Sequence, residues 1–305
     1  MYKEIYKEPL VTAIITTHNR NDLVGRAIES VLNQTYKNLE CIVVDDASDV
    51  SAECVCKKYP VQFIYIPKEE STGGNHARNV GIMKAKGTYV AFLDDDDYWL
   101  PTKIEKQVAL IEEMQCALVY SNAKPEYVHS DGTVSYAEFP MDYLKMGDMK
   151  KKIFTSICCL NITILANKQA LIDIGLFDEN IRFWQEYELT MRLAQVSPFY
   201  FVDEILAVYR VNAMDKGRLT NKYDEWLKAV DYIYKKHAEK YQNLTFFEKH
   251  CARMNFVHDA IGRSRNSGRK WRSLYYKVLL NTVFIPARLV LKRRRIKAYK
   301  MNHEF

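Results

Sequence analysis

The stretch VTAIITTHNRNDLVGRAIESVLNQTYKNLECIVVDDAS, residues 11–48, decides the fold. It contains two short apolar runs rich in β-branched residues, at 10–17 and 39–46, and such runs are typical of strands buried on both faces of a sheet. Residues 22–34 between them place five apolar side chains on one helical face: Leu23, Ala27, Ile28, Val31 and Leu32. A strand, a helix and a strand in this order predict a βαβ unit with parallel strands.

The same alternation continues through the first 120 residues. Strands are predicted at 61–67 and 88–95, and a helix at 76–87, where Gly87 suits a helix C-cap. We therefore expect an α/β fold that begins with an open, Rossmann-like, mostly parallel sheet with helices on both sides.

The second part of the chain predicts a more mixed structure. An Asp131-Gly132 pair between alternating runs indicates a β-hairpin at 126–139. A strand and a short helix are expected within 161–179, a helix at 184–196 and strands at 199–211.

The positive charge of the protein is a property of its C-terminal part. The formal net charge is +6, yet residues 261–305 carry 13 Lys and Arg against one acidic residue, while the other 260 residues carry 31 basic and 37 acidic side chains. We expect one domain at 1–215, with halves at 1–120 and 121–215, followed by a helical, basic extension at 216–305.

Cysteine usage and the N-terminus both indicate a cytoplasmic protein. The seven cysteines are odd in number and lack the spacing of a zinc site, so we expect reduced thiols. The N-terminus has no basic segment followed by an apolar core, which predicts no secretory signal. The Asn-x-Thr triplets at Asn161 and Asn243 then predict no glycosylation.

Three polar clusters follow predicted strands, at 16–20, 45–48 and 94–97. The carboxyl ends of parallel strands meet at one edge of a sheet, where ligands bind. In an extended segment Asp94 and Asp96 would project together and repel each other, and a divalent ion such as Mn²⁺ or Mg²⁺ with substrate phosphates would relieve that repulsion. The alternative is a solvated acidic turn.

A Gly-Gly pair at 73–74 leads into the predicted helix that carries His76 and Arg78. Helix N-terminal amides and an arginine suit an anion, although such a pair is also an ordinary turn. His76 either contacts a pyrophosphate or lies on the surface.

Three segments in order and register carry a family resemblance: residues 11–48, GGNHARNVGIMKAKGTYVAFLDDDDYW (73–99) and WQEYELTMRL (184–193). Over residues 8–212 the chain resembles the family 2 inverting glycosyltransferases of the GT-A fold. The resemblance implies a nucleotide-sugar donor, usually UDP-linked, a divalent cofactor (Mn²⁺ or Mg²⁺) and inversion by direct displacement.

The resemblance also implies roles for individual residues. Asp96 would be the metal ligand, Asp46 would accept a hydrogen bond from the base with Asp45 beside it, and Asp97 is left undecided. The full donor-binding set would be Thr16, Asp45, Asp46, Arg78, Asp94 and Asp95.

The family places its catalytic base in a Glu-Asp pair at the start of a helix, and here the sequence departs from that pattern. Gln185 stands where Glu is common, and Glu186 stands where Asp is usual. A glutamate reaches about one bond further, so we expect Glu186 to be the base, with Glu188, on another side of the helix, as second choice. The alternative is that Glu186 only favours a helix N-terminus electrostatically.

Two alternatives stay open for Trp184 and for Arg210, and Asn212 is a further candidate. Trp184 packs either on an acceptor sugar or in the core. Arg210 reaches the diphosphate or forms a strand-end ion pair, and Asn212 stands where some relatives have His.

The basic tail at 263–300 is interleaved with aromatic residues. Its apolar part, 278–291, is 14 residues long and interrupted by Pro286 and Arg288, whereas a bilayer span needs about 20 apolar residues. We expect an interfacial segment attracted to anionic lipid. A solvated basic helix or an oligomer contact is the alternative, and the acidic remainder of the chain argues against nucleic acid.

The sequence thus predicts an inverting glycosyltransferase that moves a sugar from a UDP-linked donor to a hydroxyl of a glycan or lipid-linked acceptor. Bacterial surface polysaccharide synthesis (O-antigen, capsule or exopolysaccharide) is the expected setting, with the protein cytoplasmic or peripheral at the inner face of the membrane. A nucleotidyltransferase would need a lysine-bearing glycine-rich loop that TTHNR (16–20) does not supply. An inactive nucleotide-sugar-binding protein is the other alternative.

Overall fold

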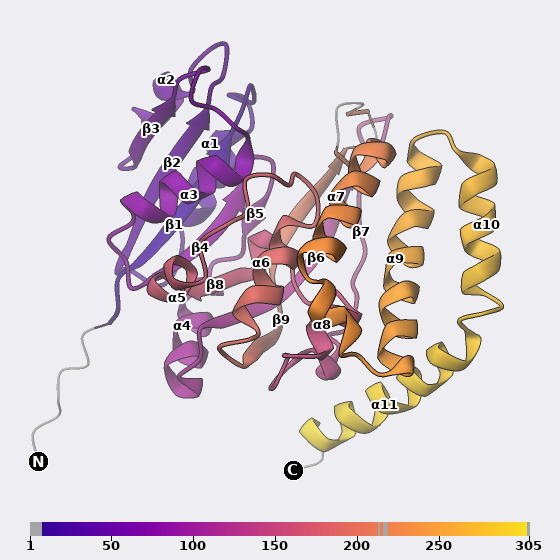
Figure 1. Cartoon of the computed structure of the whole chain (residues 1–305). Coiled ribbons are helices and arrows are strands. Elements are labelled where there is room, and N and C mark those ends of the chain that lie inside the picture. Colours follow the sequence, from indigo (N-terminus) through magenta and orange to yellow (C-terminus); the bar gives the residue numbers. More distant parts are fainter. Residues whose placement is uncertain (1–7, 213, 216–218, 304–305) are drawn as a thin grey trace, which may run out of the picture.

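A mixed nine-stranded sheet organises the protein in the computed structural model, which describes residues 8–212, 214–215 and 219–303 (Figure 1). The strand order is β3-β2-β1-β4-β8-β6-β9-β5, with β7 paired to β6. The first four strands of that order are parallel: β1 (Val11–Thr17), β2 (Leu39–Asp46), β3 (Gln62–Ile66) and β4 (Tyr89–Asp94). Every residue of β1 is buried, as expected for a strand covered on both faces.

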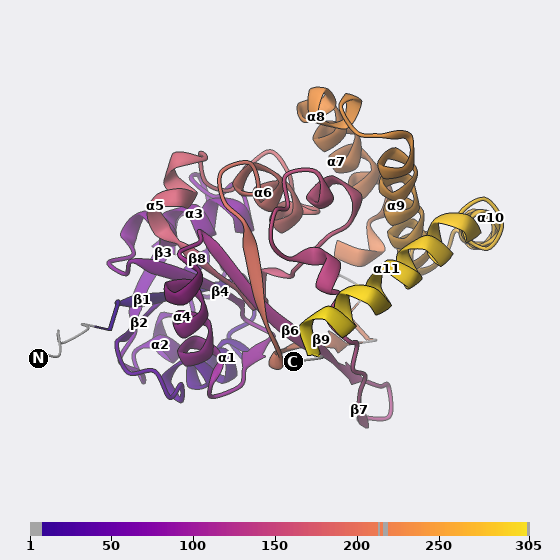
Figure 2. The same ribbon diagram turned by 90° about the horizontal axis from the view of Figure 1, so that it is seen from below.

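Helices cover both faces of this parallel half (Figure 2). Their bounds are α1 (Val24–Leu32), α2 (Glu53–Cys56), α3 (Gly74–Lys84) and α4 (Lys103–Met114). Helix α3 packs with Ile14 and Ile42 on one face, whereas α1 and α4 pack with Ile15 and Val43 on the other. The predicted α/β sheet of the GT-A type is therefore confirmed.

Gly87 does not cap α3, so that prediction is wrong. The helix ends at Lys84 and its C-cap is Ala85. A Cβ atom on Gly87 would lie 2.7 Å from the backbone nitrogen of Thr12 and 2.8 Å from the carbonyl oxygen of Leu10. The glycine is needed because the chain passes close to β1.

The second half of the sheet runs in both directions. Its strands are β5 (Tyr98–Trp99), β6 (Leu118–Val128), β7 (Val134–Tyr136), β8 (Ile164–Asn167) and β9 (Phe199–Asn212). Strand β8 is antiparallel to both β4 and β6, and β9 is parallel to β6. The predicted hairpin is present as β6 and β7, with Val128 opposite Val134. Two further helices are α5 (Lys168–Asp173) and α6 (Gln185–Leu193), and the short 3₁₀ segments are η1 (Tyr143–Lys145), η2 (Lys152–Thr155), η3 (Asn161–Thr163) and η4 (Leu219–Asn221).

The C-terminal region is helical and packs against the sheet domain. It consists of α7 (Tyr223–Lys236), α8 (Ala238–Gln242), α9 (Phe246–Asn266), α10 (Lys270–Leu280) and α11 (Ile285–His303). Trp226 of α7 is fully buried and contacts the rings of Trp184 and Phe256. Helices α9 and α10 lie side by side, and α11 runs back across them to η1, where Arg295 pairs with Asp142 at 2.7 Å (Figures 1 and 2).

Within the described ranges, no single helix is both long and apolar enough to cross a bilayer. Helices α10 and α11 satisfy that test of length and composition only when taken together, and they meet at a bend of 62°. The break falls inside the apolar segment 278–291.

Candidate active site

The loops that follow β1, β2 and β4 meet at one edge of the sheet, as the positions of the polar clusters predict. His18 Nδ1 donates to the carbonyl oxygen of Asp46 at 2.6 Å and joins the first two loops. Thr17 Oγ1 donates to Asp95 Oδ2 at 2.8 Å and joins the first loop to the acidic run. Residues 78 positions apart in the chain thus share one site.

The acidic run forms a turn, whereas an extended segment was expected. Asp94 ends β4, and the amide of Asp97 donates back to its carbonyl at 3.2 Å. Arg78 Nη2 donates to Asp94 Oδ1 at 2.6 Å. Asp95 and Asp96 instead share one nitrogen, Nη1 of Arg20, at 3.2 and 3.0 Å.

The four carboxylates have different surroundings. The side chains of Asp94 and Asp96 are 36% and 27% exposed, whereas that of Asp95 is 5% exposed. Burial raises the pKa of Asp95 to about 6, although Arg20 opposes the shift. The undecided Asp97 is buried, and its Oδ1 accepts from the backbone amide of Arg210 at 2.7 Å. Asp97 therefore ties β9 to the turn.

Arg20 is a functional candidate that the sequence analysis missed. Besides Asp95 and Asp96 it approaches Asp215, with Nη2 3.6 Å from Oδ2. The sequence did hold a signal for Arg20. It is a cation in the polar cluster 16–20, which was predicted to lie at the same edge of the sheet as the acidic run.

The predicted nucleotide-side residues separate into two groups. Thr16 lies at the end of β1 in register with Asp94, and Asp46 Oδ1 accepts from Ser71 Oγ at 2.7 Å. Asp45 is fully buried, and its two oxygens accept from the amides of Ser48 (3.0 Å) and Ala52 (2.8 Å). The carboxylate of Asp45 thus holds the loop after β2 together, and its contact with a donor stays a prediction.

Helix α6 brings the predicted base to the same charge cluster. Glu186 is half-buried near its N-terminus. Burial raises the pKa of Glu186, with nearby Asp94 adding to the rise and nearby Arg78 opposing it. With its amide oxygen turned toward Arg78, Gln185 accepts from Nη1 at 3.2 Å. Arg78 thus joins the acidic turn to the first residue of α6.

Glu188 does not fit the role of second-choice base. It is fully buried, and its carboxylate accepts from Arg192 (2.7 Å), Lys236 (2.8 Å) and His237 (3.1 Å). Burial alone would raise the pKa of Glu188, but hydrogen bonds from His237 and Arg192 outweigh it and lower the pKa to about 2. A carboxylate this well paired holds α6 to α7 and has no face open to an acceptor.

The structure also shows the surroundings of the other candidate residues. Trp184 is 4% exposed, and its Nε1 donates to Asp259 Oδ2 at 2.8 Å, so it is a core aromatic. His76 pairs with Glu179 at 3.0 Å. The Nε of Arg210 is buried and has no hydrogen-bond partner among the residues that the structure describes. Asn212, the last residue of β9, accepts from the amide of Met214.

The chemistry of the acidic turn fits a hard divalent ion that takes most of its ligands from elsewhere. In the described part of the chain, no group of three or more His, Cys, Asp or Glu side chains forms a metal site by itself. Mg²⁺ is commonly held by one or two carboxylates together with substrate phosphates and water. Asp94 and Asp96, both partly exposed, meet that smaller requirement.

The comparison with protein families places the chain. The profile of Glycosyl transferase family 2 matches residues 12–173, and the chain belongs to this family of glycosyltransferases.

Curated relatives agree with that assignment. An uncharacterized glycosyltransferase of Rickettsia prowazekii is 32% identical over 215 residues, which cover 70% of this chain and 67% of the relative. The Escherichia coli UDP-Glc:alpha-D-GlcNAc-diphosphoundecaprenol beta-1,3-glucosyltransferase WfaP is 35% identical over 156 residues, covering 51% of this chain and 60% of that enzyme. The match to WfaP thus spans less than two thirds of its length.

Solved structures share the fold. Residues 1–349 of S. aureus TarS in complex with UDP-GlcNAc superpose with a TM-score of 0.61 at 16% identity, covering 90% of this chain and 91% of that one. The mannosyltransferase PcManGT from Pyrobaculum calidifontis, in complex with GDP-Man and Mn²⁺, superposes with a TM-score of 0.57 at 18% identity, covering 97% and 88%.

Proposed function

We propose that this protein is an inverting glycosyltransferase that moves a sugar from a UDP-linked donor to a hydroxyl of a lipid-linked or glycan acceptor in bacterial surface polysaccharide synthesis. One observation carries the proposal: Arg78 joins the acidic turn, through Asp94, to the start of the helix that holds Glu186. Donor-side and acceptor-side groups are thereby fixed relative to each other. The activity for which WfaP is named, glucosyl transfer from UDP-Glc to a diphosphoundecaprenol-linked sugar, supports the choice of donor and acceptor class.

The donor would bind across the loops after β1, β2 and β4. Asp46, held by Ser71 at 2.7 Å, would accept a hydrogen bond from the uracil base, with Thr16 beside the nucleoside. Arg78 and the unpaired Nε of Arg210 would donate to the diphosphate. Buried cationic donors favour an anionic ligand because they lose little side-chain entropy when it binds.

Asp96, with Asp94, would hold a divalent cation. When bound, such an ion offsets the negative charge that develops on the leaving diphosphate. Arg20 holds Asp95 and Asp96 in position from the opposite side of the turn. Asp95, being buried, would orient Arg20 and Thr17 and would not contact the donor directly.

Glu186 would accept the proton of the attacking hydroxyl. Its raised pKa makes it a stronger base than a solvated glutamate, provided that it is ionised. Activity should therefore decline as the pH falls through the raised pKa. The neutral Gln185 would keep Arg78 in place without adding a second charge beside Glu186.

The test is sugar transfer by Glu186→Gln. Removing a general base lowers turnover by about 10²–10⁴-fold. Affinity for UDP should stay within about twofold, because the substitution does not touch the proposed donor site. Unchanged turnover in Glu186→Gln would show that the base lies elsewhere. A wild-type protein that neither transfers sugar from nor hydrolyses any nucleotide sugar in a panel would refute the enzyme assignment.

A further inference from the structure

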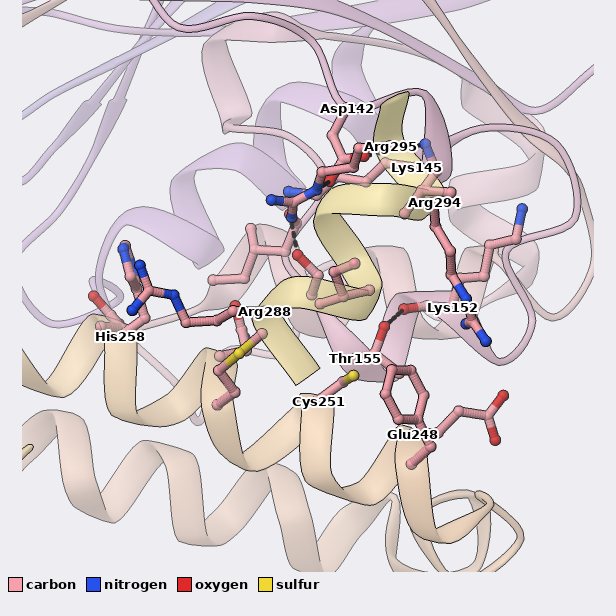
Figure 3. Close-up of a pocket in the computed structure, with 18 of the residues that line it drawn as sticks. Asp142, Lys145, Lys152, Thr155, Glu248, Cys251, His258, Arg288, Arg294 and Arg295 are labelled. Carbon is pink, nitrogen blue, oxygen red and sulfur yellow. Dashed lines mark hydrogen bonds and ion pairs between the residues drawn. The ribbon is translucent and has the colours of Figure 1, made fainter. Parts of the chain in front are cut away.

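A basic cavity of about 670 Å³ lies away from the acidic turn, between α9, α11 and the segment 142–157 (Figure 3). Five cationic side chains line it, against three acidic ones. The cationic residues are Lys145, Lys152, Arg288, Arg294 and Arg295. In Figure 3 the labelled arginines of α11 and the lysines of the facing segment surround this space.

The acidic residues of the cavity already have partners. Asp142 accepts from Arg295 at 2.7 Å, Glu248 accepts from Thr245 in the capping box of α9, and Asp259 accepts from Arg263 at 2.8 Å. Two of the three carboxylates thus form ion pairs with arginines, and Glu248 caps α9.

Three of the cations lack such a partner. Among the described residues, Lys152, Arg288 and Arg294 form no ion pair with a carboxylate, although Arg294 interacts electrostatically with Glu248. Each is nevertheless positioned: Lys152 donates to the carbonyl of Met146, Arg288 donates to Asn281, and Arg294 lies over the ring of Phe247. Positioned cations that form no direct ion pair suit a multivalent anion.

An apolar hollow of about 530 Å³ continues from this cavity along α11. The two spaces share Met254, Arg288, Leu291 and Arg295, and the hollow adds Ile285, Leu289, Lys292 and Ile296. Leu289 and Ile296 are 56% and 50% exposed. Charge at one end and exposed apolar side chains at the other match a ligand with an anionic head and a hydrocarbon chain.

The cavity also borders the element that carries the proposed base. Asp259 lines the cavity and accepts from Nε1 of Trp184, the residue immediately before α6. A ligand headgroup in this space would thus lie beside Asp259, whose partner Trp184 immediately precedes the helix that carries Glu186.

We propose that this cavity binds the diphosphate of a polyprenyl-diphosphate-linked acceptor, with Lys152, Arg288 and Arg294 on the phosphates and the polyprenyl chain along α11. This inference rests on the proposed function, because it names the acceptor class of that reaction. The anionic headgroup of a membrane phospholipid offers related chemistry, so the test separates the two sources.

The experiment is flotation of the full-length protein with phosphatidylcholine vesicles that contain either undecaprenyl diphosphate or phosphatidylglycerol. The test variant is Arg288→Gln with Arg294→Gln. The control is Arg293→Gln with Lys297→Gln, which removes the same charge from the same helix at exposed positions that do not line the cavity. The test variant should bind undecaprenyl diphosphate vesicles at least about tenfold more weakly, and the control within about twofold of wild type.

Both double variants should bind phosphatidylglycerol vesicles equally less than wild type, because attraction to an anionic lipid surface depends on overall charge. Equal loss on undecaprenyl diphosphate vesicles, or no loss in either variant, overturns the proposal.

A second variant fills the cavity without changing its charge. Asn255→Trp, on the cavity-facing side of α9, should weaken binding to undecaprenyl diphosphate as strongly as the double arginine variant. Retained binding in a variant whose thermal unfolding matches wild type contradicts the proposal.

UDP binding by calorimetry separates this proposal from the proposed function. It should be unchanged in every cavity variant. A wild-type protein that binds undecaprenyl diphosphate through the cavity but neither binds UDP nor transfers sugar would refute the function and leave the cavity. A protein that transfers sugar but does not bind undecaprenyl diphosphate would refute the cavity proposal and leave the proposed function.

Discussion

The acidic turn after β4 and the middle of helix α6 both contain a buried carboxylate, but its pKa is raised in the turn and lowered in the helix. Glu188 in α6 accepts from Arg192, Lys236 and His237, and its pKa is lowered to about 2. Asp95 in the turn shares one arginine with Asp96, and burial raises its pKa to about 6. A structural carboxylate is fully compensated inside the protein, whereas the turn holds more negative charge than its arginines neutralise. That difference supports the proposal that the turn is a binding site.

The largest expected effect is on stability, from Glu188→Gln. The substitution leaves Arg192, Lys236 and His237 without their shared buried partner, and breaking such a pair costs about 3–5 kcal/mol. The midpoint of urea unfolding at pH 7 measures it. Because the folded pKa of Glu188 is lowered from 4.5 to about 2, its contribution is present above pH 4.5 and should fade as the pH drops from there toward 2. A wild-type midpoint in Glu188→Gln would remove the structural role.

Arg78→Lys should mainly damage turnover. A lysine keeps the charge but cannot hold Asp94 and Gln185 with one planar group. Loss of a hydrogen bond to a charged group, together with misplacement of α6, should lower kcat/KM by about 100-fold. The matched control is Arg192→Lys, which weakens the Glu188 cluster and should lower stability without changing turnover of the folded protein. If both variants lose activity alike, Arg78 has no special part.

Asp45→Asn and Asp46→Asn test whether Asp45 stabilises the loop after β2 while Asp46 binds the donor. An amide at position 45 can still accept from only one of the two buried amides, of Ser48 and Ala52, so unfolding should be about 1–3 kcal/mol easier. Asp46→Asn should instead weaken UDP binding and leave stability near wild type. Calorimetry and chemical denaturation on both variants decide the matter, and the reverse pattern would return Asp45 to the donor site.

The smallest effect on stability is expected from Asp95→Asn. Unlike Glu188→Gln and Asp45→Asn, this substitution should stabilise the protein above pH 6. A carboxyl whose folded pKa is raised favours the folded state when protonated, so wild-type stability should fall as the pH rises from about 4 to 6. Above pH 6 the neutral amide should therefore stabilise the protein, by about 1 kcal/mol after its weaker hydrogen bond to Arg20 is allowed for. Thermal unfolding at pH 4 and pH 7.5 measures this. If Asp95→Asn is less stable than wild type at both pH values, the charge of Asp95 is balanced inside the protein, as that of Glu188 is.

The sequence was sufficient for the parallel half of the sheet. Strands β1, β2 and β4 are apolar runs that are largely buried, the edge strand β3 is an apolar run that is only partly buried, and helix α1 has one apolar side. The Asp131-Gly132 hairpin was equally local, because its turn chemistry is written in two adjacent residues.

What the sequence could not supply were contacts between distant segments. The roles of Asp45, Asp97 and Glu188 depend on partners at positions 48–52, 210 and 192–237, which no local pattern indicates. Arg20 and the basic cavity were hidden for the same reason, since the cavity exists only because α11 folds back toward 142–157. The division of the chain at residue 215 and the membrane role of the tail stay predictions.

The most direct test of the account is calorimetric binding of UDP with Mn²⁺, with Mg²⁺ and with a chelator. If the acidic turn holds a divalent ion against the donor diphosphate, UDP should bind at least about tenfold more tightly with metal, and Asp96→Asn should abolish that difference. Equal UDP affinity in the presence of the chelator, or a metal effect that survives in Asp96→Asn, would contradict the assignment of the acidic turn.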